Sequence, residues 1–113
     1  VIVTARGYLS GSAGERLEEE IGRLLSKGNR DFVINFKAAD MVNSVGISIL
    51  VGVIEKVRDY RGRLCFSELS TVNDEVFRLM GLDRFVSFKN NDSDAVASLD
   101  CKSGGEADTE AKS

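Results

Sequence analysis

The sequence alternates short, nearly continuous apolar runs with longer segments in which apolar residues recur every three or four positions. The clearest pair is the run at residues 31–36 and the segment at residues 44–60, whose apolar positions are 47, 50, 53, 54 and 57. A continuous run is typical of a strand covered on both faces, and the longer spacing is typical of an amphipathic helix. Strands that alternate with helices of this length predict an α/β fold whose sheet is at least partly parallel.

The same two patterns place the other elements. They predict further strands at residues 1–9, 63–66 and 85–88, and further helices at residues 12–27, 70–80 and 92–99. The strand at residues 31–36 is expected to be central. Apolar periodicity ends near Asp100, so we expect one domain over residues 1–100 and a flexible acidic tail over residues 101–113.

Charge and hydropathy restrict the partners of the chain. The net charge is -3, and the 15 basic residues are scattered rather than gathered into a stripe that could follow a phosphate backbone. Nucleic acid is therefore not an expected partner. No apolar run reaches the roughly 20 residues that a membrane-spanning helix needs, and no secretory signal is visible. We expect no membrane insertion and a cytoplasmic location.

The residue types that most enzymes and metal sites require are scarce. The chain has no histidine and only two cysteines, Cys65 in a predicted strand and Cys101 in the predicted tail. It also lacks a phosphate-binding Gly-x-x-x-x-Gly-Lys loop and a nucleophile with a visible base. The carboxylates of Asp31 and Asp40 are more typical of solvated loop acids or helix caps than of an acid–base pair. We therefore predict no catalytic residues, no metal site and no cofactor.

The junction at residues 40–47 is the most informative segment for function. An apolar strand ends there, a long helix begins, and Ser44 lies at the boundary. A phosphate on such a serine would be stabilised by backbone N–H groups and by the helix dipole. Two structural interpretations remain open. Ser44 could be only the helix cap, and Gly46 and Gly52 could permit close helix packing rather than present a smooth surface to a partner.

Several short motifs together resemble the STAS domain, and in particular the anti-sigma factor antagonists of bacteria. They are residues 7–10 (Gly-Tyr-Leu-Ser), residues 43–47 (Asn-Ser-Val-Gly-Ile), Ser70 and residues 80–82 (Met-Gly-Leu). The resemblance extends over nearly all of residues 1–99 in the same order of elements. It implies an α/β fold with four helices and a small mixed sheet of about four strands.

The resemblance also implies a regulatory function. In antagonists of this family the serine that matches Ser44 is phosphorylated by an ATP-binding anti-sigma factor that is a serine kinase. The unphosphorylated form binds that kinase and so releases the sigma factor. Asn43 stands where the family usually has aspartate, and it keeps the capacity to accept a hydrogen bond. The expected partner-binding residues are Met41, Val42, Asn43, Ser44, Val45, Gly46, Ile47 and Ser48.

A second interpretation keeps the fold without the switch. The chain would then be a STAS subunit that docks to a membrane transport complex or to a signalling scaffold. The genes beside it distinguish the two, because a switching protein is expected next to a small ATP-binding kinase and a transport subunit next to membrane components. A homodimer is compatible with either interpretation.

Overall fold

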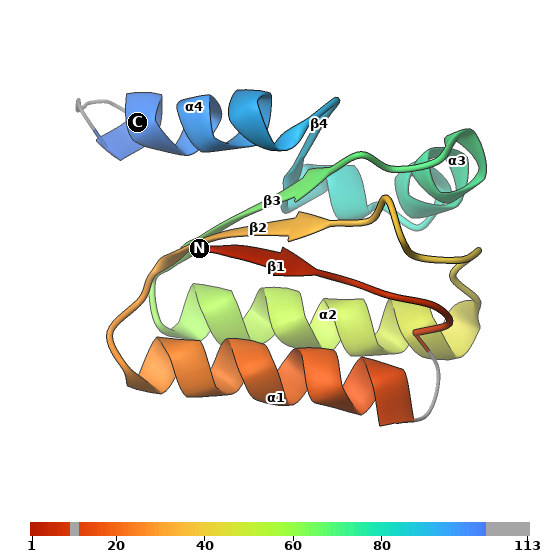
Figure 1. Cartoon of the computed structure of the whole chain (residues 1–113), viewed down its shortest axis with the longest axis horizontal. Coiled ribbons are helices and arrows are strands. Elements are labelled where there is room, and N and C mark those ends of the chain that lie inside the picture. The colour runs from red at the N-terminus through yellow and green to blue at the C-terminus, as the bar shows by residue number, and fades with distance from the viewer. Residues whose placement is uncertain (10–11, 104–113) are drawn as a thin grey trace.

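The computed structural model describes residues 1–9 and 12–103, over which strands and helices alternate (Figure 1). Ser10 of the first resemblance motif and residues 104–113 of the predicted tail lie outside this part of the chain. The elements are β1 (Ile2–Thr4), α1 (Ser12–Ser26), β2 (Asp31–Asn35), α2 (Ser44–Asp59), β3 (Arg63–Ser67), α3 (Thr71–Leu79), the short 3₁₀ helix η1 (Leu82–Arg84), β4 (Ser87–Lys89) and α4 (Asp92–Ser103).

The four strands form one sheet in the order β1-β2-β3-β4, and every adjacent pair is parallel. The predicted α/β class, with four helices and four strands, is confirmed. The sheet is not mixed, however. After each of β1, β2 and β3, a helix carries the backbone back to the end of the sheet at which that strand began, so the next strand runs in the same direction. β2 lies between β1 and β3, as the apolar run predicted.

Helices cover both faces of the sheet (Figure 1). α1 and α2 lie side by side on one face, α4 crosses the other, and α3 lies beyond the end toward which the strands point. The side chains of β2 alternate accordingly. Phe32 and Ile34 belong to the main core with the apolar residues of α1 and α2, whereas Val33 packs in a smaller cluster with Cys65, Ala95 and Leu99.

A cluster of aromatic rings connects α3 to the sheet. Phe66 of β3 lies 4.9 Å from Phe36, 5.8 Å from Phe77 and 5.8 Å from Phe88, measured between ring centroids. Phe77 projects from α3 and is fully buried. Edge-to-face and offset ring pairs at these distances add to the free energy gained by burial. The cluster therefore fixes α3 against the carboxyl end of the sheet.

Three predicted boundaries differ from the structure by two residues or more, and others differ by one. The first strand ends at Thr4 rather than near residue 9, because the chain turns at Gly7, whose φ of 62° lies in the left-handed region. Phe85 caps η1, so the last strand begins at Ser87. The first residues of the predicted tail instead continue α4 to Ser103, since no helix-breaking residue precedes Gly104.

Candidate functional site

The boundary between β2 and α2 is built around a helix cap at Asn43. The backbone of Asn43 is extended, with φ -91° and ψ -175°, and its side-chain oxygen accepts a hydrogen bond from the Gly46 N–H at 3.0 Å. Its carbonyl accepts the first helical bond, from Ile47 N–H at 2.9 Å. Asn43 therefore caps the helix, and the interpretation of Ser44 as the cap is wrong.

Ser44 is the first residue of α2, and it is exposed. Within the described residues its hydroxyl makes no hydrogen bond, so the oxygen is not required by the fold. The N–H groups of Ser44 and Val45 belong to the first turn and have no acceptor within the helix. One turn later, the Ser48 hydroxyl donates to the Ser44 carbonyl at 3.1 Å. The site thus combines an available nucleophilic oxygen with free backbone donors.

The loop that leads into this helix is held from one side by the turn at Gly7. Gly7 N–H donates to the Ala38 carbonyl, and Asp40 N–H donates to the Gly7 carbonyl, both at 3.0 Å. The positive φ of Gly7 permits this pairing. The loop between β2 and α2 is consequently attached to the segment that follows β1.

The same loop is held from the other side by Asn73 of α3. This side chain is fully buried, accepts from Val42 N–H at 2.9 Å and donates to the Asp40 carbonyl at 3.2 Å. Its own N–H donates to the Ser70 hydroxyl, which caps α3. Sequence reasoning missed Asn73. The available signal was its spacing, because it lies four residues before Phe77 on the buried stripe of α3.

Three of the predicted partner-binding residues are buried, and this part of the prediction is corrected. Val42, Gly46 and Ile47 all lie within the protein, with Val42 and Ile47 in the main core. A Cβ atom at position 46 would lie 2.6 Å from Val42 Cγ1, so Gly46 permits close packing inside the domain. A Cβ atom at position 52 would lie 3.1 Å from a carboxylate oxygen of Glu18 on α1, the far end of a flexible side chain. The contacts therefore support the close-packing interpretation for Gly46.

The other predicted residues form an exposed surface around the start of α2, which we call the Ser44 surface. Its members are Met41, Asn43, Ser44, Val45 and Ser48. Met41 is 62% exposed and Val45 is 51% exposed, a high value for apolar side chains. Two more exposed apolar residues, Tyr8 and Val72, adjoin Gly7 and Asn73 in the chain. Apolar groups with a polar rim are typical of the centre of a protein interface.

The cap at Asn43 can be tested separately from the hydroxyl at Ser44. We expect Asn43→Ala to lower the free energy of unfolding by about 1 kcal/mol, because the Gly46 N–H loses its acceptor. Asn43→Asp keeps an acceptor and places a negative charge at the positive end of the helix, so it should be at least as stable as the wild type. Urea denaturation measures both variants. Equal losses in the two variants would show that Asn43 does not act as the cap.

Comparison with known proteins places this geometry in a family. Residues 1–95 match the STAS domain. BtrV of Bordetella bronchiseptica, which is named as an anti-sigma factor antagonist, is 26% identical over 99 residues, which are 88% of this chain and 85% of BtrV. In the described ranges, no helix has both the length and the apolar character needed to cross a bilayer.

Solved structures share the fold. The anti-sigma factor antagonist SpoIIAA, from Bacillus, aligns in its unphosphorylated form with a TM-score of 0.74 and 18% identity, over 88% of this chain and 87% of that one. Its phosphorylated form gives a TM-score of 0.68. The STAS domain of a SulP transporter from Vibrio cholerae aligns with a TM-score of 0.78 and 15% identity, over 92% of this chain and 84% of that one. From the match over residues 1–95, the chain belongs to the STAS domain family.

Proposed function

We propose that this protein is an anti-sigma factor antagonist whose binding to an ATP-dependent anti-sigma kinase in the cytoplasm is switched by phosphorylation of Ser44. The observation that carries the proposal is the exposed Ser44 hydroxyl, which caps nothing and has no hydrogen-bond partner in the described chain. A kinase can reach such an oxygen without unfolding the helix. The function is regulated binding rather than catalysis.

The position of Ser44 suits a phosphate energetically. A phosphoserine carries about -1.5 to -2 charges near neutral pH, and the N-terminus of a helix stabilises a negative charge by roughly 0.3 to 2 kcal/mol. The N–H groups of Ser44 and Val45 are available as donors. The folded domain would therefore accept the modification without loss of stability.

The same charge would weaken binding to a partner. In the unmodified protein the exposed apolar side chains of Met41 and Val45 flank Ser44 and can form the centre of an interface. A phosphate between them must lose its hydration when the partner docks, which is costly unless the partner supplies matching charges. A penalty of about 1.4 kcal/mol already lowers affinity tenfold. Phosphorylation would thus release the partner while the fold persists.

The relatives support this proposal by analogy. BtrV and SpoIIAA carry the name anti-sigma factor antagonist, and SpoIIAA has been solved in unphosphorylated and phosphorylated forms. The similarity to the SulP transporter domain favours a second candidate function, a constitutive subunit of a membrane transport complex. The genes adjacent to this one distinguish the candidates, because only the first requires a neighbouring anti-sigma kinase.

The central test replaces Ser44 with aspartate and measures affinity for the kinase encoded beside the protein. We expect Ser44→Asp to bind at least tenfold more weakly than the wild type, because the carboxylate must be desolvated in the interface. Its midpoint of urea denaturation should equal or exceed that of the wild type, because the charge lies at the helix N-terminus. Isothermal titration calorimetry with the purified kinase gives the affinity.

Matched variants separate the position from the charge. Ser48→Asp adds the same charge one turn further along an exposed face and should weaken binding less, and Ser44→Ala should bind as the wild type does. Incubation with the kinase and ATP should add one phosphate to the wild type and none to Ser44→Ala, as read by mass spectrometry. Unchanged affinity of a folded Ser44→Asp, or phosphate on another residue, would refute the switch.

A further inference from the structure

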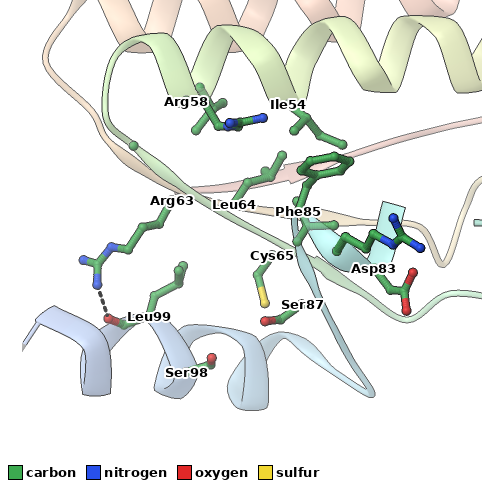
Figure 2. Close-up of a pocket in the computed structure, with 14 residues that line it drawn as sticks. Ile54, Arg58, Arg63, Leu64, Cys65, Asp83, Phe85, Ser87, Ser98 and Leu99 are labelled. Atoms are coloured by element: carbon green, nitrogen blue, oxygen red, sulfur yellow. Dashed lines mark hydrogen bonds between the residues drawn. The ribbon is translucent and has the colours of Figure 1, made fainter. Parts of the chain in front are cut away.

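A cavity lies far from the Ser44 surface, between the end of α2, the start of β3, η1 and α4 (Figure 2). Its volume is about 250 Å³. This is slightly below the roughly 300–1,000 Å³ typical of pockets for drug-sized ligands, so the occupant must be smaller than those. Ser44 and Arg58 lie at opposite ends of α2, roughly 21 Å apart along the helix axis at 1.5 Å per residue. The cavity is thus distinct from the proposed phosphorylation site.

The sheet itself opens this space. Arg63 N–H donates to the Arg30 carbonyl, and the Ser67 carbonyl accepts from Phe36 N–H. The backbone hydrogen-bonding groups of alternate β3 residues, among them Arg63 and Ser67, therefore point toward β2. Leu64 belongs to the other set of alternate residues, so its backbone N–H and C=O point toward the side of β3 on which β4 lies. The register of β4 begins with Ser87 opposite Cys65, so no β4 residue lies opposite Leu64. The late start of β4 therefore leaves a gap at this corner of the sheet.

The lining of the cavity combines apolar side chains with a larger share of polar surface, and basic side chains lie at its rim. Ile54, Leu64 and Leu99 line the interior, and Figure 2 shows their side chains around the open space. Arg58 and Arg84 line the same cavity, and both are exposed. A lining that combines apolar side chains with charged groups suits a small amphipathic molecule.

The charges at this rim are not balanced within the protein. In the described chain neither Arg58 nor Arg84 lies within ion-pair distance of a carboxylate. Asp83, which also lines the cavity, lies 4.0 Å from Arg78, and Arg63 makes a two-pronged ion pair with Asp31. A protein with net charge -3 thus presents, beside one cavity, two guanidinium groups that have no carboxylate partner in the described chain. This arrangement favours an anion.

An aromatic ring adds a flat contact surface beside these guanidinium groups. The Phe85 ring lines the cavity, is 54% exposed, and has the Arg58 guanidinium 5.4 Å from its centroid. Figure 2 shows Arg58 and Phe85 on the same side of the open space. Arg58 already covers part of this ring, so a planar ligand would contact the part of the ring that remains exposed, and guanidinium groups bind carboxylates through paired hydrogen bonds.

We propose that this cavity binds a small aromatic carboxylate. The ring of the ligand would lie among Ile54, Leu64 and Phe85, and its carboxylate would face Arg58 and Arg84. A neutral amide of the same shape lacks the charge that the arginines recognise, and acetate lacks the ring that would contact Ile54, Leu64 and Phe85. The site is therefore expected to bind most tightly those small ligands that have both a negative charge and an aromatic ring.

Titration with benzoate tests the proposal on the intact chain. We expect saturable shifts of the backbone amide signals of Leu64, Phe85 and Ser87 in ¹⁵N–¹H correlation spectra, with a dissociation constant in the millimolar range. Benzamide and acetate should each bind at least tenfold more weakly, because each loses one of the two interactions. Absence of saturable shifts with benzoate, or equal shifts with acetate, would refute the site.

Arginine variants provide the second arm of the test. The double variant Arg58→Gln with Arg84→Gln changes only exposed side chains and should keep the wild-type spectrum elsewhere, yet bind benzoate at least tenfold more weakly. Arg23→Gln on α1 removes an exposed arginine that is remote from the cavity and should bind benzoate as the wild type does. Unchanged binding by the double variant would show that the rim arginines do not recognise the anion.

Discussion

Replacement of Asn73 by alanine is expected to lower the free energy of unfolding by about 2–4 kcal/mol. The substitution removes the acceptor of the buried Val42 N–H and the donor to the Asp40 carbonyl. A buried polar group that loses its partner costs about 1–3 kcal/mol, and truncation leaves a void in a fully buried position. Urea denaturation followed by circular dichroism measures the change.

A matched asparagine shows whether the loss comes from these contacts. Asn90 is exposed, so Asn90→Ala should change stability by less than about 0.5 kcal/mol. Native-state hydrogen exchange adds a local readout, since the Val42 amide should exchange much faster in Asn73→Ala than in the wild type. If Asn73→Ala were as stable as Asn90→Ala, or Val42 stayed equally protected, α3 would not hold the loop in place.

Replacement of Phe66 by alanine is expected to cost about 3–5 kcal/mol of stability. Phe66 is fully buried at the centre of the aromatic cluster, and its ring contacts those of Phe36, Phe77 and Phe88. Loss of the ring removes buried apolar area and leaves a cavity between the sheet and α3. Because small domains are stable by only about 5–15 kcal/mol, the midpoint of denaturation should fall steeply.

An exposed phenylalanine provides the comparison for this variant. Phe85 is 54% exposed, so Phe85→Ala loses far less buried area and should cost much less than Phe66→Ala. Chemical denaturation of the two variants under the same conditions gives the difference directly. Similar losses would contradict the central place of Phe66 in the core.

The parts of the fold that follow from local periodicity could be predicted from the sequence. The stripe from Ile47 to Val57 gave the second helix, and its start near Ser44 and end near Tyr60 agree with the structure. The apolar run at residues 31–36 gave an inner strand for the same reason. By contrast, the first strand was predicted too long, because Gly7 leaves the strand conformation for a tertiary contact with Ala38 that no local pattern reveals.

The candidate site was only partly predictable. The position of Ser44 at a helix start follows from the sequence, but which neighbour caps the helix depends on backbone angles, and Asn43 takes that role. Periodicity already placed Ile47 on the buried stripe, and its assignment to the partner surface ignored that constraint. Asn73 acts on Val42 from 31 residues away in the chain, so only the tertiary fold brings them together. The cavity at Arg58 depends on tertiary placement in the same way.

Adjacent residues at the start of α2 divide two tasks that a single serine often combines. Asn43 keeps the helix closed, and the oxygen of Ser44 is left without structural duty. A covalent group added to that oxygen therefore breaks no bond on which folding depends, and its removal restores the earlier state without refolding. The helix cap therefore stays intact whether or not the oxygen of Ser44 carries such a group.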